Sequence, residues 1–302
     1  MNESEMILTH NLTKRYGRRG RGIEDVDLEV REGEVFGFLG PNGAGKTTTI
    51  RTLLGFLRPT AGNATIFGLD VCEESVKIRA RVGNLPGEFT LEDRMTGEDL
   101  LRFFSRLRGI KDLSYAHELS ERLEADLHRP MRRLSRGNKQ KIGLVQAMFH
   151  KPPLLILDEP SGGLDPLVQE EFLRLVDEVK AEGRTVFFSS HVLSEVERVC
   201  DRVGIIRDGE LVTVEPTHTL VDKAFSHVTL TFDAPVDGRP FDALPGVEGL
   251  KADGPKLSFT LYSEPDAMVK LAARHRLVSM EYEHPSLEEI FLTYYGPHGG
   301  ER

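Results

Sequence analysis

The sequence predicts an α/β fold with a mainly parallel sheet, followed by a smaller α+β domain. One observation is a repeated alternation of short apolar runs, such as Val35–Leu39 and residues 154–157, with helical patterns over residues 5–220. Strands that alternate with helices in this way form βαβ units and hence parallel sheets. A second observation is the change of pattern after about residue 224, where the order becomes β-α-β-β-α-β-α, close to a ferredoxin-like split βαβ. We therefore divide the chain into residues 1–222 and residues 223–302.

Local patterns predict the elements of the first part in order. Residues 6–39 alternate apolar and polar side chains in short runs, which predicts antiparallel strands joined by turns. Thr96 and Asp99 are close to a capping pattern at the start of a segment with apolar residues at helical spacing. With the helical patterns that follow, this segment predicts a helical subdomain at about residues 88–150. Asp208 and Gly209 lie between two short apolar runs, which predicts a hairpin turn.

Composition and charge exclude several classes of protein. The formal net charge of −9 argues against a nucleic-acid-binding surface, which needs a basic footprint. The first residues lack the basic and apolar regions of a signal peptide, and no apolar run approaches the roughly eighteen residues of a membrane span. Cys72 and Cys200 have no metal-binding spacing, so we expect free thiols in a reducing cytosol. Any membrane role must then come through a partner protein.

Residues 40–48, Gly-Pro-Asn-Gly-Ala-Gly-Lys-Thr-Thr, fit the P-loop pattern G-x-x-x-x-G-K-[ST]. An apolar strand precedes them and a helical pattern follows, which is the context that the motif requires. The glycines let successive backbone N–H groups face one phosphate chain, and the helix N-terminus adds partial positive charge. Lys46 should reach the β- and γ-phosphates, and the Thr47 hydroxyl should bind Mg²⁺. The alternative, a Gly-rich turn with an incidental lysine, is disfavoured by the flanking strand and helix.

Acidic and histidine side chains follow two further apolar strands. Asp158 ends one strand, where it fits a Walker B acid that holds Mg²⁺, and Glu159 can orient or deprotonate a water. His191 follows the next strand, where a ring N–H could reach the γ-phosphate; a lone histidine would more often be structural. The carboxyl ends of parallel strands meet at one edge, so one site can collect these residues with the P-loop.

The order of the motifs resembles the ATP-binding subunits of ABC transporters. The residues that carry the resemblance are residues 40–48, Leu134-Ser135-Arg136-Gly137-Asn138-Lys139-Gln140, residues 154–159, Leu164-Asp165 and His191. The Leu-Ser-x-Gly-x-x-Gln segment is similar to the signature loop, which separates this family from other P-loop proteins. The resemblance covers roughly residues 5–220 and is strongest to the ATPases of drug and antibiotic exporters.

The resemblance implies a set of ATP-binding positions and partners. Tyr16 matches the aromatic residue that stacks on adenine, although edge-strand packing is its alternative role. The phosphate cradle corresponds to Asn42, Gly43, Ala44, Gly45, Lys46, Thr47 and Thr48. Ser135, Gly137 and Asn138 match positions that contact ATP on a partner subunit, and Asp165 matches the loop between the two sites. The family therefore implies ATP and Mg²⁺, two head-to-tail ATPase subunits, a polytopic permease, and a peripheral place on the cytoplasmic face of the cell membrane.

The sequence departs from the family pattern at two positions. Arg136 replaces the second glycine of the signature and adds charge near a phosphate site. Gly87, followed by Glu88, stands where the family's loop carries a glutamine. Glycine has no side chain to ligate Mg²⁺, and Glu88 would substitute only if the loop shifts by one residue.

Three functions fit these motifs to different degrees. The first is the ATP-hydrolysing subunit of a membrane exporter of a drug, an antibiotic or a lipid-like molecule, with catalytic Lys46, Glu159 and His191. For this function we expect Phe89, Leu100, Phe103 and Phe104 in or beneath a groove that receives the permease, with core burial of the Phe103–Phe104 pair as the alternative. The second is a soluble ABC ATPase in translation or DNA repair, which usually has two such domains or a long coiled coil. The third is a nucleotide-binding switch with little hydrolysis, which the presence of Glu159 and His191 disfavours.

Overall fold

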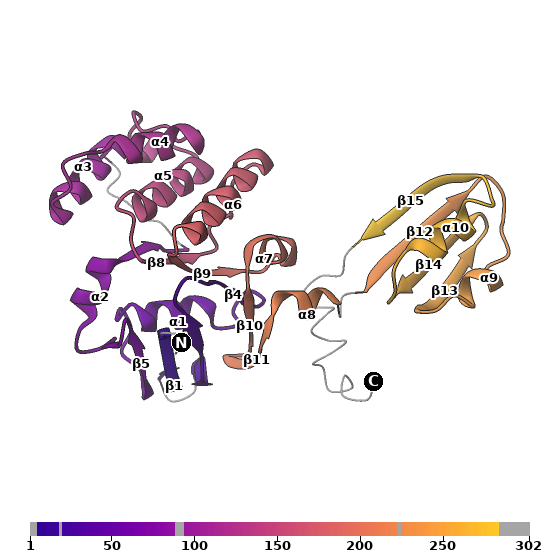
Figure 1. Ribbon diagram of the computed structural model, residues 1–302, viewed down its shortest axis with the longest axis horizontal. Coiled ribbons are helices and arrows are strands. Elements are labelled where there is room, and N and C mark those ends of the chain that lie inside the picture. Colours follow the sequence, from indigo (N-terminus) through magenta and orange to yellow (C-terminus); the bar gives the residue numbers. More distant parts are fainter. Residues whose placement is uncertain (1–4, 18–19, 88–93, 223–224, 284–302) are drawn as a thin grey trace. The chain divides into compact units, whose positions relative to one another are not determined.

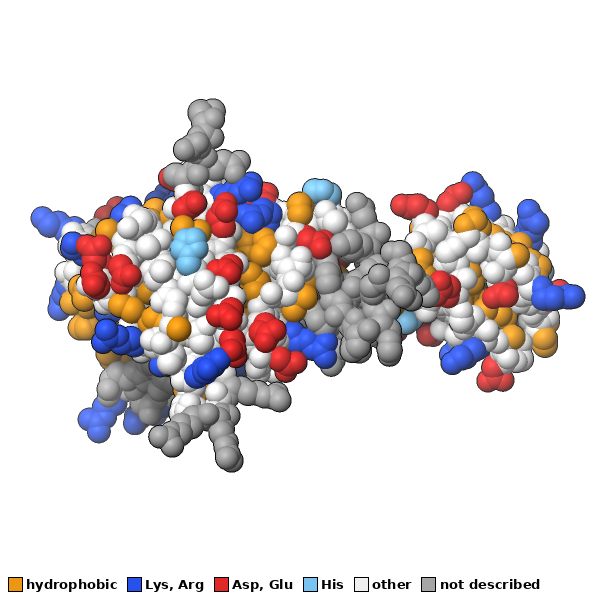
Figure 2. Space-filling model, turned by 90° about the horizontal axis from the view of Figure 1, so that it is seen from below, with side chains coloured by type: hydrophobic (Ala, Val, Ile, Leu, Met, Phe, Trp, Pro, Cys, Tyr) orange, Lys and Arg blue, Asp and Glu red, His pale blue; other side chains and the backbone are white. Residues whose placement is uncertain are grey.

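The computed structural model describes residues 5–17, 20–87, 94–222 and 225–283. It forms two compact units, residues 1–217 and residues 218–302 (Figure 1). The face shown in Figure 2 mixes acidic, basic and apolar side chains. Among the described residues, no helix combines the length and the apolar character that a membrane span needs.

The first unit contains a six-stranded sheet in the order β11-β10-β4-β9-β8-β7. The strands are β4 (Val35–Leu39), β7 (Val82–Leu85), β8 (Leu154–Asp158), β9 (Thr185–Ser190), β10 (Arg202–Arg207) and β11 (Glu210–Pro216). All neighbours are parallel except β10 and β11, which form the hairpin that Asp208 and Gly209 predict. These two turn residues have φ of 50° and 92°, as the tight turn requires. The parallel register brings the carboxyl ends of β4, β8 and β9 to one edge.

An antiparallel sheet forms the N-terminal part of the same unit. Its order is β2-β1-β5-β6, with β3 also paired to β1. The strands are β1 (Glu5–Tyr16), β2 (Gly20–Val26), β3 (Glu29–Arg31), β5 (Ala61–Ile66) and β6 (Leu69–Asp70). Side chains of this sheet, of the parallel sheet and of α1 (Lys46–Leu53) share one core. Burial of apolar surface in this shared core joins the two sheets, and within the parallel sheet Phe187 stacks on Phe36 with ring centroids 5.8 Å apart.

Helices complete the first unit (Figure 1). They are α2 (Ser75–Arg81), α3 (Gly97–Arg108), α4 (Ser114–Arg122), a short 3₁₀ helix (Met131–Arg133), α5 (Arg136–Met148), α6 (Pro166–Ala181) and α7 (Leu193–Val199). The next helix, α8 (Thr217–Asp222), begins at the last residue of this unit and continues into the second. Thr96 and Asp99 form a reciprocal capping box at the start of α3, as the sequence predicts. Arg122 on α4 binds Glu171 and Glu178 on α6 at 2.6–2.7 Å, which fixes the helical region to α6.

The predicted permease groove is partly described. Leu100 is buried in the unit, whereas the Phe103 ring is 51% exposed. Phe104 is half-buried and packs edge-on against Phe103, with centroids 5.5 Å apart. The alternative prediction, that both rings are buried in the core, is therefore wrong for Phe103. Phe89 lies outside the described residues.

Over the described residues 225–283, the second unit is a four-stranded antiparallel sheet with two short helices. The elements are β12 (Ser226–Phe232), α9 (Arg239–Asp242), β13 (Val247–Asp253), β14 (Lys256–Leu261), α10 (Asp266–Ala272) and β15 (Leu277–Glu283), and the sheet order is β13-β14-β12-β15. In this order the first strand lies between the third and the fourth, as in a split βαβ arrangement. Alternate residues of β12 and β14 are buried against Phe241 and Met268. The helix expected over residues 285–295 lies outside the described residues.

Acid should destabilise the first unit through His150, which follows α5. Burial, and then the positive charges of Arg108 and Arg184, lower the pKa of His150 to about 4 from 6.5. Between these pH values the unfolded chain binds a proton that the folded chain does not, so stability falls as the pH drops through this window. We expect this residue to cost on the order of 2 kcal/mol between pH 6.5 and 4. Urea unfolding at pH 7 and pH 5 measures the effect: His150→Gln should lose less stability than the wild type, and an equal loss would contradict the assignment.

Candidate active site

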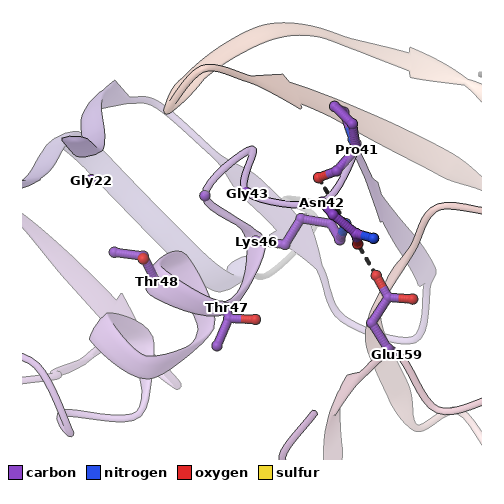
Figure 3. Close-up of a pocket in the computed structure, with 9 residues that line it drawn as sticks. Gly22, Pro41, Asn42, Gly43, Lys46, Thr47, Thr48 and Glu159 are labelled. Atoms are coloured by element: carbon purple, nitrogen blue, oxygen red, sulfur yellow. Dashed lines mark hydrogen bonds and ion pairs between the residues drawn. The ribbon is translucent and has the colours of Figure 1, made fainter. Parts of the chain in front are cut away.

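Residues 40–45 turn sharply between β4 and α1. A cavity of about 220 Å³ is lined by residues 41–43 and 45–48, with Gly22 and Glu159 (Figure 3). Gly43 and Gly45 have φ of 82° and 114°, which L side chains rarely adopt. A Cβ at Gly45 would lie 2.8 Å from Ile23 Cγ2, so glycine is needed for space as well. The first turn of α1 has no side-chain cap and no acidic residue. Its N–H groups are therefore available to an anion, and phosphate is a group that such a terminus binds.

Lys46 points into this cavity from the first residue of α1 (Figure 3). Its side chain is 6% exposed, and Nζ donates to the carbonyl oxygens of Gly40 at 2.5 Å and Pro41 at 3.2 Å. Nζ also forms an ion pair with Glu159 Oε1 at 3.0 Å. A buried ammonium group in this place is well suited to a negatively charged ligand.

Glu159 lies between Lys46 and His191. Its second carboxylate oxygen, Oε2, is 2.6 Å from His191 Nδ1. The backbone of Glu159 has φ of 50°, a left-handed conformation that non-glycine residues seldom adopt and that often marks a functional site. The structure thus brings the three predicted catalytic residues into one chain of contacts.

Thr47 and Asp158 meet beside this chain of contacts. The Thr47 hydroxyl donates to Asp158 Oδ2 at 2.8 Å, and Asp158 is 1% exposed. Hydroxyl and carboxylate oxygens are the donors that Mg²⁺ prefers, usually with waters and substrate phosphates completing the shell. Among the described residues no group of three or more His, Cys, Asp or Glu side chains is placed to hold a metal by itself. The donor set therefore fits Mg²⁺ bound together with a phosphate ligand.

Gly87 follows β7 and faces the same carboxylate. A Cβ at this position would lie 3.0 Å from Asp158 Oδ2, so the backbone of Gly87 is close to the proposed metal ligands and contributes no side chain to them. Glu88, the other predicted ligand, lies outside the described residues.

Tyr16 lies beside the C-terminal end of the P-loop. Its ring is 43% exposed, and its hydroxyl is 3.4 Å from Thr48 Oγ1. Lys14 Nζ lies 5.9 Å from the ring centroid. An exposed ring beside the phosphate cradle leaves its face available for stacking, which edge-strand packing alone would not require.

The signature residues line a different hollow, of about 540 Å³. Ser135 caps α5 by accepting the Asn138 N–H at 3.2 Å, while Asn138 Oδ1 accepts the Asp126 N–H at 3.0 Å. A Cβ at Gly137 would lie 2.4 Å from the carbonyl oxygen of Gly163. Within one chain, the described residues of this hollow and those of the P-loop cavity are separate sets.

Asp165 joins the signature hollow from the start of α6. Its carboxylate caps α6 by accepting the Val168 N–H at 3.1 Å and lies 3.4 Å from Lys141 Nζ. The Val168 N–H first, and then the charge of Lys141, lower the pKa of Asp165. Arg136, beside Ser135, is exposed.

Comparison with known proteins identifies the family. A family model described as ABC transporter matches residues 23–162. The bacitracin transport ATP-binding protein BcrA of Bacillus licheniformis is 39% identical over 219 residues, which are 70% of each chain. This chain belongs to the ABC transporter ATP-binding proteins. The linearmycin resistance ATP-binding protein LnrL of Bacillus subtilis is 29% identical and spans 96% of this chain and 98% of its own. The solved dimeric structure of a bacterial ABC transporter cassette superposes with a TM-score of 0.65 at 25% identity, covering 70% of this chain and 99% of the cassette.

Membership of this family makes the protein an ATPase. Two further residues contact the predicted site, and they were not identified as site residues from the sequence. Ser189 donates to Asp158 Oδ1 at 2.6 Å and accepts the Glu159 N–H at 3.0 Å, so it positions both acids. Gln140 Nε2 donates to the carbonyls of Glu159 at 3.0 Å and Pro160 at 3.1 Å, which ties α5 to the catalytic segment. Ser189 is the next-to-last residue of a buried strand. A buried polar side chain nearly always has a hydrogen-bond partner, so a serine at this position indicates a contact with a neighbouring polar group. Gln140 belongs to the signature segment, but the motif alone does not indicate these contacts.

Proposed function

We propose that this ABC ATPase powers the export of a small molecule, such as a drug, an antibiotic or a lipid-like compound, through a polytopic membrane permease. The protein would act at the cytoplasmic face of the cell membrane. The printed names of two relatives, for bacitracin transport and linearmycin resistance, support this class of substrate. The observation that carries the proposal is that the P-loop residues around Lys46 and the signature residues around Ser135 line separate hollows in one chain, which suits two half-sites that act on different nucleotides.

The P-loop half-site would bind ATP in cis. The N–H groups of residues 42–48 and the Lys46 ammonium bind the phosphates, and Tyr16 stacks on the adenine. Thr47 and Asp158 would hold Mg²⁺, which would supply positive charge against that of the bound phosphates. Glu159 accepts a proton from the attacking water, and His191 holds the Glu159 carboxylate and donates toward the γ-phosphate.

The signature half-site would bind ATP held by a second subunit. Ser135, Gly137 and Asn138 present the N-terminus of α5 to the partner's phosphates, and Asp165 contributes from the crossing loop. The Asn138 side chain has its amide NH₂ group for this role, since its oxygen already accepts from Asp126. ATP then favours a closed head-to-tail dimer, and loss of the γ-phosphate removes the contact that distinguishes closed from open.

Residues 1–222 would form the ATP-binding domain, with residues 88–150 as its helical subdomain, and residues 223–302 the accessory domain. The permease would contact α3, where Phe103 and Leu107 are 51% and 66% exposed and one helical turn apart. Two exposed apolar side chains at this spacing form a surface that a partner helix can cover.

Co-purification from detergent-solubilised membranes tests the proposed partner. We expect a polytopic membrane protein to copurify, and Phe103→Glu with Leu107→Glu to lower its yield by about tenfold or more, because two apolar contact residues become charged. Val212→Glu, a change at a 37% exposed apolar residue on β11, is the matched control and should leave the yield unchanged. Recovery of ribosomes or DNA in place of a membrane protein would contradict the exporter assignment.

A further inference from the structure

Glu159 has an unusual backbone conformation for its place in the sequence. Its φ is 50°, and it directly precedes Pro160. Residues other than glycine seldom adopt this left-handed conformation, and a residue before proline is normally extended. Such a conformation persists only where the surrounding structure holds it in place. The contacts that hold the backbone of Glu159 are therefore part of how the site is built.

Hydrogen bonds from three segments hold this backbone. The Glu159 N–H donates to Ser189 Oγ on β9 at 3.0 Å. The Glu159 carbonyl oxygen accepts from the Gly162 N–H at 3.1 Å, within the same loop, and from Gln140 Nε2 on α5 at 3.0 Å. Gln140 Nε2 also donates to the carbonyl oxygen of Pro160 at 3.1 Å, so its two N–H groups bind two successive carbonyls. Gln140 therefore fixes the orientation of both peptide groups that follow Glu159.

Gln140 is placed to act on the site through the backbone of Glu159. It is 6% exposed and lies in the second turn of α5. A buried amide group without a partner is costly, so Gln140 has few alternatives to these two carbonyls. It is not among the described residues that line the P-loop cavity. Its effect on a bound nucleotide would therefore be indirect.

The backbone conformation of Glu159 sets the direction of its carboxylate. In the left-handed conformation Oε1 lies 3.0 Å from Lys46 Nζ and Oε2 lies 2.6 Å from His191 Nδ1 (Figure 3). A return of φ to an ordinary negative value would move Cβ and both oxygens with it. A general base works only within hydrogen-bond reach of the proton that it accepts, and a misplacement of about 1 Å costs about 100-fold in rate.

We propose that Gln140 is a positioning residue for ATP hydrolysis, which keeps the backbone of Glu159 left-handed and so aims the carboxylate of the base. This inference rests on the proposed role of Glu159 as that base. Gln140 belongs to the helix that begins in the signature segment. The aim of the base therefore depends on how this helix is seated against the catalytic segment.

Gln140→Met keeps the length of the side chain but cannot donate a hydrogen bond. We expect kcat to fall by about 100-fold, as for a misplaced catalytic group. The KM for ATP should stay nearly unchanged, because Lys46 and Thr47 are untouched. The Mg²⁺ concentration for half-maximal turnover should also stay the same, since Asp158 keeps its contacts with Thr47 and Ser189.

Gln146→Met is the matched control. Gln146 is 7% exposed and lies about 9 Å farther along the same helix, so the same substitution is made at an equally buried position. It should leave turnover close to that of the wild type, and thermal unfolding of both variants reports whether α5 stays folded. Gln140→Glu is a second variant of the same length. Its ionised carboxylate faces the two carbonyl oxygens without a donor, so kcat should fall at least as far.

A double-mutant cycle with Glu159→Gln decides the route by which Gln140 acts. Single-turnover hydrolysis by the full-length chain, with protein in excess over ATP, measures the slow variants. Gln140→Met should lower the rate by about 100-fold when Glu159 is present. It should leave the rate nearly unchanged in Glu159→Gln, because the base that it positions is already lost.

The other results would overturn the inference. Full turnover in Gln140→Met would show that Glu159 keeps its aim without the amide, and the proposed base would stand. An equal fall in rate with and without Glu159, or a higher KM with unchanged kcat, would indicate only a structural or a binding role for Gln140. Undiminished hydrolysis by Glu159→Gln would instead remove the proposed base, and the positioning role would fall with it.

Discussion

Replacing Glu159 with Gln should lower the rate of ATP hydrolysis by a factor of about 10² to 10⁴, the usual contribution of a general base. The amide keeps the shape of the carboxylate but cannot accept a proton from water. It also removes the negative charge that lies 3.0 Å from Lys46 Nζ and 2.6 Å from His191 Nδ1. ATP should therefore bind without being turned over, and the closed dimer should accumulate.

Phosphate release and light scattering in the presence of ATP and Mg²⁺ measure the two effects of Glu159→Gln together. Glu170→Gln on α6 is the matched control, because Glu170 is half exposed and pairs with Arg174 on the same helix. Turnover that is undiminished in Glu159→Gln would remove Glu159 from the catalytic role. Lost turnover without ATP-dependent association would instead contradict the head-to-tail clamp.

The sequence was most informative where one local rule decides the conformation. Gly43 and Gly45 predict the P-loop because few other residues adopt their backbone angles, and Thr96 with Asp99 predicts a helix start because the two side chains satisfy each other's backbone. The alternation of buried strands with helices predicts a parallel sheet, and hence the common edge where Lys46, Glu159 and His191 meet.

Contacts between segments distant in the chain could not be predicted in the same way. Ser189 contacts Asp158 because β8 and β9 are neighbours in a specific register, which strand patterns do not specify. Asn138 resembles an ATP ligand by its place in the signature, yet its side-chain oxygen accepts from the Asp126 backbone. The exposure of the Phe103 ring could not be decided from the sequence either, because helical periodicity does not say where a neighbouring element ends.

Replacing Gly137 with Ala should abolish ATP-dependent association while leaving ATP binding at the P-loop intact. The added Cβ would lie 2.4 Å from the carbonyl oxygen of Gly163, a backbone atom that cannot turn away as a flexible side chain can. The start of α5 and the loop before α6 must separate, which displaces Ser135 and Asp165 together. Because we propose that the signature half-site acts on the partner's nucleotide, we expect turnover to fall by about 100-fold or more, as for loss of a transition-state electrostatic contact.

Nucleotide titration and turnover separate this effect from general unfolding. Gly137→Ala should bind a fluorescent ATP analogue with nearly wild-type affinity, because Lys46 and Thr47 belong to the other hollow. Lys139→Ala, two residues along α5, removes atoms instead of adding them and should leave turnover close to that of the wild type.

A mixture of Gly137→Ala with Lys46→Ala chains gives the sharpest result. In a head-to-tail pair, one composite site then carries both defects and the other neither, so the mixture should recover turnover that neither variant has alone. No recovery on mixing would show that both half-sites act on a single chain's nucleotide, or that the two composite sites cannot work independently.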